Sequence, residues 1–155
     1  MSVHFKPINS REKGAGGERE FARLVLEHLG VALVRNLEQS RQGGHDLIAP
    51  GSDPVSLALN RYAIEVKRYR EITPALLAEF WRQAERQAHH AAKFPALAYR
   101  QDRQEWAVTV PLHSLNREAF QPEWTGLEWA ATLSVPAFCC LIREQAGENS
   151  GVSTP

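Results

Sequence analysis

Residues 61–70, RYAIEVKRYR, constrain the fold of this chain more than any other stretch. The Ala, Ile, Val and Tyr content is typical of a β-strand, and the two-residue period of a strand places Glu65 and Lys67 on one face. Ile64 and Val66 then point to the opposite face. The charged residues have two interpretations: they form an ion pair on a solvent-exposed face, or they face a reacting group.

Length and composition indicate one folded domain. The chain has 155 residues, of which 43% are hydrophobic and 23% charged, as in ordinary globular proteins. No apolar run approaches the ~20 residues of a membrane span, and residues 1–14 lack the apolar core of a signal peptide. We therefore expect a cytoplasmic protein that makes no membrane contact. Cys139 and Cys140 are adjacent in the run AFCCLI, which favours a buried strand with free thiols.

The net charge is zero, which argues against a protein that binds nucleic acid through bulk positive charge. The distribution is uneven, because residues 1–70 carry 11 basic and 8 acidic side chains, whereas the remainder carries 7 and 10. The half that contains the 61–70 strand is therefore the basic half.

An amphipathic helix is predicted after the glycine-rich residues 14–17 and ends at Gly30. Its apolar stripe is formed by Phe21, Leu24, Val25, His28 and Leu29. Glu18 falls in the first turn of this predicted helix, where a carboxylate suits the helix dipole. Glu20 satisfies the dipole equally well on another face, so we interpret Glu18 as the acid that points inward.

Asp46 stands at the start of a predicted strand, residues 45–49, directly after a Gly-Gly turn. Its side chain either caps the preceding loop or serves as a ligand held on a rigid edge. The loop itself, residues 38–44, is polar and glycine-rich, and Arg41 is available there for phosphate contact.

The remaining chain predicts a helix over residues 74–93, strands at 95–100 and 106–112, and a short helix at 113–120. Two apolar stretches follow at 127–135 and 137–142. We expect residues 1–13 to be a mobile arm, residues 14–143 a single domain, and residues 144–155 a disordered tail.

Glu18, Asp46, Glu65 and Lys67 would thus converge across a small sheet. Three carboxylates form an oxygen-rich site that suits a hard cation such as Mg²⁺, which polarises a phosphodiester and lowers the pKa of a bound water. Lys67 would orient that water or offset charge in the transition state. No His or Cys cluster suits zinc, and no serine elbow or P-loop occurs in the sequence.

The motifs GGERE, GGHDLIA and AIEVKRY, in an αβββαβ order, resemble the PD-(D/E)XK nuclease superfamily, and within it the Holliday junction resolvases of archaeal and phage type. The resemblance covers residues 14–112. It implies an α/β, restriction-endonuclease-like fold with a central mixed sheet flanked by helices. His45 stands where the name of the motif has proline, a position that supplies backbone. Residues from 113 onward have no counterpart.

The resemblance also implies roles for individual residues. Asp46, Glu65 and the backbone carbonyl of Val66 would bind Mg²⁺, which Mn²⁺ would replace, with Glu18 as a further ligand. Lys67 would be the catalytic lysine. Substrate contacts would come from Ser40, Arg41, Arg68, Arg70 and Gln83, of which Ser40 and Arg41 lie in the loop of residues 40–44.

The sequence therefore predicts a magnesium-dependent DNA endonuclease, encoded by a bacterium or a phage, that acts on branched DNA in recombination or repair. By resemblance we expect a homodimer, with the helix of residues 74–92 or the Trp-rich C-terminal region at the contact. Two alternatives stay open: the same chemistry on duplex ends, flaps or nicks, and a catalytically idle DNA-binding module of this fold.

Overall fold

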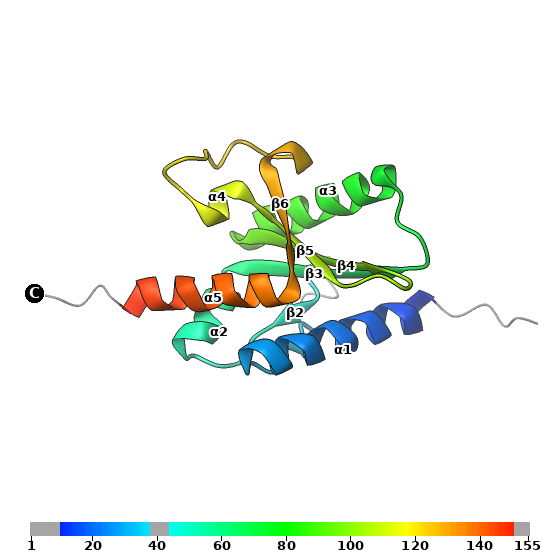
Figure 1. Cartoon of the computed structure of the whole chain (residues 1–155), viewed down its shortest axis with the longest axis horizontal. Coiled ribbons are helices and arrows are strands. Elements are labelled where there is room, and N and C mark those ends of the chain that lie inside the picture. The colour runs from blue at the N-terminus through cyan, green and yellow to red at the C-terminus, as the bar shows by residue number, and fades with distance from the viewer. Residues whose placement is uncertain (1–9, 38–43, 151–155) are drawn as a thin grey trace, which may run out of the picture.

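The structure, a computed structural model, describes residues 10–37 and 44–150 (Figure 1). Its elements, in chain order, are α1 (Ser10–Leu29), β1 (Val34–Arg35), β2 (Leu47–Ile48), α2 (Pro54–Leu59), β3 (Tyr62–Tyr69), α3 (Pro74–Ala91), β4 (Phe94–Gln101), β5 (Ala107–Pro111), α4 (Leu112–Leu115), the 3₁₀ turn η1 (Leu127–Trp129), β6 (Ala130–Ser134) and α5 (Val135–Ser150).

The strands form one mixed sheet in the order β1-β2-β3-β4-β5-β6. β3 and β4 pair in parallel along their whole length, and the other neighbours are antiparallel. The 61–70 segment is therefore a central strand, as its apolar content predicts, and the expected mixed sheet flanked by helices is confirmed.

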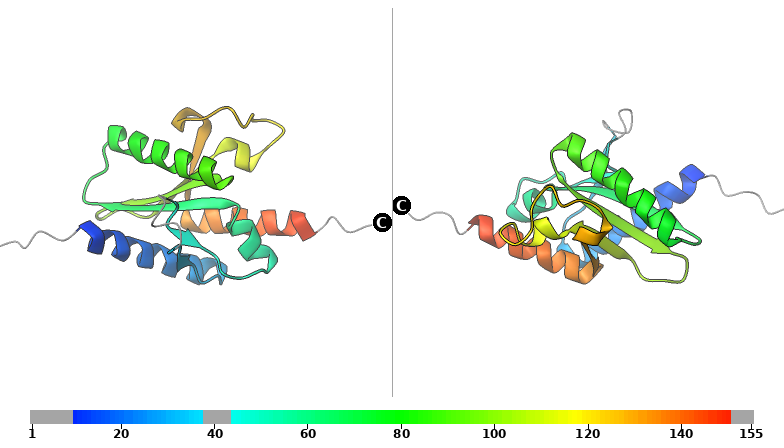
Figure 2. Two further views of the ribbon diagram at one scale, coloured as in Figure 1. Left: turned by 180° about the vertical axis from the view of Figure 1, so that it is seen from behind. Right: turned by 90° about the horizontal axis from the view of Figure 1, so that it is seen from above.

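Helices cover both faces of the sheet (Figures 1 and 2). Phe21 of α1 and Phe138 of α5 belong to the larger hydrophobic core on one face, whereas Phe80 and Trp81 of α3 form a smaller core with Leu97 on the other. No helix within residues 10–37 and 44–150 is long and apolar enough to cross a bilayer.

The predicted 74–93 helix is confirmed as α3. Thr73 caps it by accepting a hydrogen bond from the Leu76 amide (3.2 Å), and Pro74 occupies the position where a missing N–H costs nothing. The left-handed conformation of Ala92 (φ 54°) ends the helix.

The expected buried strand at residues 137–142 is wrong, because this segment belongs to α5. The buried side chains Val135, Phe138, Ile142 and Ala146 follow the helical period. A short apolar run is ambiguous between strand and helix, and the Ser134 hydroxyl, which accepts a hydrogen bond from the Ala137 amide at 3.2 Å, favours the helix. Cys139 is buried and Cys140 exposed, both as free thiols.

The expected chain boundaries also shift. α1 begins at Ser10 and not after residue 13, and α5 extends through Ser150, seven residues into the expected disordered tail. The unpredicted helix α2 is capped by Asp53, whose carboxylate accepts from the Ser56 amide (3.1 Å) and hydroxyl (2.7 Å).

Candidate active site

The candidate site lies at the edge of β3, where the two-residue strand β2 stops covering it. β2 pairs with β3 only through Leu47 and Ile64. Beyond that pair, Asp46 continues the contact: its amide donates to the Ile64 carbonyl (2.9 Å), and its Oδ2 accepts from the Val66 amide (2.8 Å). The N–H and C=O of one strand residue point the same way, so the Val66 carbonyl faces this edge as well.

Glu65 and Lys67 share one face of β3, as the strand period predicts. Lys67 Nζ lies 3.1 Å from Glu65 Oε1 and 5.2 Å from the centre of the Phe80 ring of α3. Gln83 of α3 donates from Nε2 to the same Glu65 oxygen at 3.4 Å. The ion pair is largely buried, with side-chain exposures of 17% for Lys67 and 4% for Glu65, so the solvent-face interpretation is wrong.

Glu18 enters the site from α1 and is buried, in agreement with its interpretation as the acid that points inward. Because α1 begins at Ser10, Glu18 lies in the middle of the helix and not in its first turn, so the dipole interpretation does not apply. The residue before it, Gly17, lets α1 approach β3 closely, since a Cβ there would lie 3.1 Å from Arg68 Cβ.

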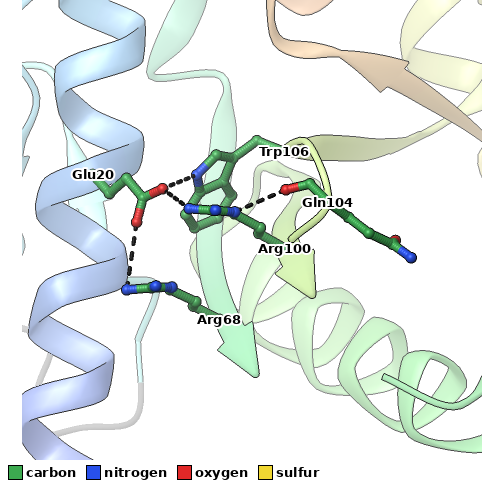
Figure 3. A network of polar contacts seen from close by, with 5 residues as sticks. All are labelled: Glu20, Arg68, Arg100, Gln104 and Trp106. Atoms are coloured by element: carbon green, nitrogen blue, oxygen red, sulfur yellow. Dashed lines mark hydrogen bonds and ion pairs between the residues drawn. The ribbon is translucent and has the colours of Figure 1, made fainter. Parts of the chain in front are cut away.

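Glu20 anchors α1 to β3, to β4 and to Trp106, the residue before β5 (Figure 3). Its Oε1 accepts hydrogen bonds from Arg100 and from the Trp106 indole N–H (3.0 Å), and its Oε2 lies 3.6 Å from Arg68 Nη1. Arg100 also donates to the Gln104 carbonyl at 2.8 Å. This network fixes the helix two residues beyond Glu18 and thereby positions that carboxylate.

Burial and mutual repulsion raise the pKa of all three carboxyl groups. Burial, followed by the charge of Glu65, raises the pKa of Asp46 to about 7. Burial raises the pKa of Glu65. The positive charge of Lys67 opposes this rise, and the negative charge of Glu18 adds to it. The pKa of Glu18 is raised by burial and by Asp46, while Arg35 acts against the rise.

The three carboxyl groups, Val66 and Lys67 line one cavity of about 260 Å³. Within the described ranges, no group of three or more His, Cys, Asp or Glu side chains is arranged to hold a metal ion. Mg²⁺ is instead commonly bound by one or two carboxylates together with waters and substrate phosphate. Asp46 and Glu65 fit that pattern, since Glu65 Oε2 is buried and has no hydrogen-bond partner in the described part of the chain.

The other predicted residues differ in their placement. Gln83 contacts Glu65, as above, and Arg68 lines the cavity while paired with Glu20. Arg70 follows the end of β3, is exposed and does not line the cavity. Ser40 and Arg41 lie outside the described residues.

Sequence reasoning missed two neighbours of the carboxylates. Arg35 of β1 places Nε 2.7 Å from Glu18 Oε2, and Gln87, one turn beyond Gln83, is a polar neighbour that acts against the raised pKa of Glu65. Gln87 shares the i, i+4 spacing of Gln83 and could have been found from it, whereas nothing in the sequence near Arg35 marks it.

His45 supplies more than backbone. Its ring is buried, Nε2 lies 3.5 Å from Lys93 Nζ, and burial followed by the charge of Lys93 lowers its pKa to about 4. The ring is therefore neutral at pH 7.

A mixed sheet with helices on both faces and with acids and a lysine at the edge of its central strand is the arrangement of a PD-(D/E)XK nuclease. The family described as "Phage putative PDDEXK endonuclease" matches residues 9–132. The chain therefore belongs to this family of endonucleases.

Two individual proteins are also similar to the chain. "Protein D14" of Escherichia phage T5 is 26% identical over 117 residues, which cover 66% of this chain and 71% of that protein. The solved structure of Hjc, a Holliday junction resolvase from the archaeal hyperthermophile Archaeoglobus fulgidus, is 19% identical. Its TM-score is 0.37, with 84% of this chain and 98% of that chain covered.

Proposed function

We propose that this nuclease is a divalent-metal-dependent DNA endonuclease, with branched DNA such as a four-way junction as its substrate. One observation carries the proposal: Asp46 and Glu65 face the same cavity at the free edge of β3, with Lys67 Nζ 3.1 Å from Glu65 Oε1. The choice of branched DNA rests on the likeness of the three sequence motifs to those of junction resolvases.

Asp46, Glu65 and the Val66 carbonyl would hold Mg²⁺, or Mn²⁺ in its place, and Glu18, which lines the same cavity and pairs with Arg35, would be a further ligand. These are hard oxygen donors, and the burial and mutual repulsion that raise the pKa values of Asp46 and Glu65 support the binding of a cation beside them. The cation, when bound, would polarise the scissile phosphodiester and lower the pKa of a water.

The side chains of the chain itself supply the remaining chemistry. The Lys67 ammonium, held by Glu65 over the Phe80 ring, stabilises negative charge on the phosphate oxygens as the attacking water adds. Gln83 orients Glu65. Arg70, which forms no ion pair among the described residues, and Arg68 contact phosphates beside the scissile bond.

The test uses labelled four-way junction, flap and linear duplex DNA, each with Mg²⁺, with Mn²⁺ and with EDTA. We expect symmetric nicking of the junction with either cation and none in EDTA. Glu18→Gln lowers the rate, whereas the matched control Glu27→Gln, on the exposed side of the same helix, leaves it unchanged. Cutting in EDTA would contradict metal dependence, and equal cutting of all substrates would contradict the choice of branched DNA.

Symmetric nicking requires two active sites, so we also propose that the nuclease acts as a homodimer. Light scattering at the concentration of the cleavage assay measures the mass, and a monomer that still nicks both strands symmetrically would contradict this part.

A further inference from the structure

A second cavity, of about 250 Å³, lies on the other side of α3 from the carboxylates. We call it the tryptophan pocket, after its lining residues Trp81, Trp124 and Trp129. Gln83 and Gln87 point from α3 toward Glu65, whereas Glu85 and His89 line this pocket. Positions two residues apart on a helix differ by about 200°, so α3 separates the two cavities.

The segment between α4 and β6 closes the pocket against α3, and the two run side by side in both views of Figure 2. Glu85 Oε2 accepts a hydrogen bond from the Gly126 amide at 3.1 Å and so ties this segment to the helix. Trp124 stacks on Trp129, with ring centres 4.5 Å apart and planes inclined by 32°.

The lining offers flat aromatic surface. Trp124 is 40% exposed, so part of its ring is free to stack on a ligand. Trp81 lines the pocket with its ring, whereas its Nε1 atom is buried and not accessible to a ligand. Trp81 and Glu85 are four positions apart on α3 and therefore lie on the same side of it.

Positive charge borders the pocket. Arg82, Arg86 and His89 line an adjoining hollow together with Glu85 and Thr125, so its charged side chains are two arginines and one glutamate. Both arginines are exposed, and neither forms an ion pair within residues 10–37 and 44–150. Two free guanidinium groups one helical turn apart match the charge of consecutive backbone phosphates.

We propose that the tryptophan pocket binds the base of an unpaired nucleotide, which stacks on the exposed part of Trp124, while the flanking phosphates lie on Arg82 and Arg86. A nucleotide in a strand offers a flat ring and adjacent phosphates together, and stacking on aromatic side chains tolerates any sequence. The inference rests on the proposed function for the identity of the nucleic acid, and it gives the nuclease a contact with unpaired DNA remote from the cleavage site.

A second copy of the chain is a poorer occupant. Among the exposed large hydrophobic side chains of the described residues, only Trp124 lines the pocket. A stable dimer contact requires a broad apolar area, whereas a concave pocket with convergent polar groups suits a small planar ligand.

Fluorescence anisotropy in EDTA, with the full chain, tests the inference without any cleavage. The probes are a labelled twelve-nucleotide oligo(dA) strand, an abasic strand of the same length and charge, and dAMP as competitor. We expect the wild type to bind oligo(dA) more tightly than the abasic strand. If dAMP displaces the labelled strand as effectively as unlabelled oligo(dA) does, the result would support a base-binding pocket whose ligand is a free nucleotide.

Trp124→Ala should weaken oligo(dA) binding by at least about fivefold, the lower range for loss of one stacked base, and should leave abasic binding unchanged. Trp124→Phe should restore most of the loss, and a melting curve identifies any variant that fails to fold. Arg82→Ala acts on an exposed side chain and should lower the salt slope by about 0.7, whereas Arg23→Ala on α1, the matched control, should not.

Equal affinity for oligo(dA) and the abasic strand would overturn the inference. A wild-type dimer that Trp124→Ala dissociates, without any change in oligo(dA) affinity, would also overturn it and would assign the pocket to a contact between copies. Cleavage without base-dependent binding contradicts this inference alone, and base-dependent binding without cleavage contradicts the proposed function alone.

Discussion

Replacing Asp46 by asparagine should stabilise the metal-free protein, which is the opposite of the usual result for a buried polar residue. The carboxyl group has a pKa of about 7 in the folded protein and about 3.9 in an unfolded chain. Because the pKa of Asp46 is higher in the folded protein than in the unfolded chain, the protonated carboxyl group contributes to the stability of the folded state. This contribution is fully present below about pH 4. It is lost as the pH rises through 7.

The size of the stabilisation follows from the difference in the pKa of Asp46 between the folded and the unfolded protein. A rise of about 3 pKa units corresponds to at most about 4 kcal/mol of lost stability at pH 8. Asparagine keeps an oxygen that can accept from the Val66 amide, so the variant loses the charge and not the contact. Even about 1 kcal/mol would raise the Tm of a chain of this length by about 2–4 °C.

Thermal melts of wild type and Asp46→Asn in EDTA, at pH 5 and at pH 8, measure the effect. The Tm difference should favour the variant and grow with pH. The neutral ring of His45 acts in the opposite direction, because its folded-state pKa of about 4 makes stability fall as the pH drops below 6.5. This term is common to both proteins and cancels in the comparison.

The matched control is Asp53→Asn. The pKa of Asp53 is lowered by its hydrogen bonds to the Ser56 side chain and amide, so its carboxylate stabilises the folded state above pH 4 and asparagine should not raise the Tm. Adding Mg²⁺ should stabilise the wild type far more than Asp46→Asn. A lower Tm for Asp46→Asn than for wild type at pH 8 in EDTA would refute the reasoning.

Four further outcomes are expected. Lys67→Ala abolishes cleavage and retains the wild-type circular dichroism spectrum, and residual cutting by the purified variant would count against its catalytic role. Glu65→Gln raises the Tm in EDTA slightly, and less than Asp46→Asn, because Lys67 loses its partner; a fall in Tm would argue against carboxylate repulsion. Glu20→Ala lowers the free energy of unfolding in urea by about 1–3 kcal/mol, since it leaves the buried Trp106 N–H without an acceptor, and Glu20→Gln, which keeps the acceptor oxygen, costs less. Arg35→Ala raises the pKa of Glu18, so the acid limb of the pH–rate profile moves to higher pH; an unmoved limb would exclude Glu18 from the rate-limiting step.

The local sequence was sufficient to predict the central strand and the pairing of Glu65 with Lys67. A two-residue period admits only two faces, and Lys67 cannot leave the face of Glu65 while the strand persists. Gln83 was reached through family resemblance, and the structure places its amide against Glu65.

The C-terminal helix could not be predicted reliably from the pattern. Six apolar residues in a row satisfy both strand and helix periods, and the local cap from Ser134 together with packing against α1 and α2 favours the helix. The role of Glu20 was equally hidden, because its partners Arg68, Arg100 and Trp106 lie 48 to 86 positions away in the chain. These residues come close to Glu20 only when the sheet has folded.

Because β2 is short, the hydrogen exchange of the Val66 amide should report on the state of the Asp46 side chain. In the described structure, the Val66 amide is held by the Asp46 side chain and not by a neighbouring strand. Its proton should therefore exchange with deuterium slowly while Asp46 accepts from it, and faster when that carboxyl group is protonated or removed. A single exchange rate would thus follow the protonation state of the Asp46 carboxyl group in solution, with no substrate present.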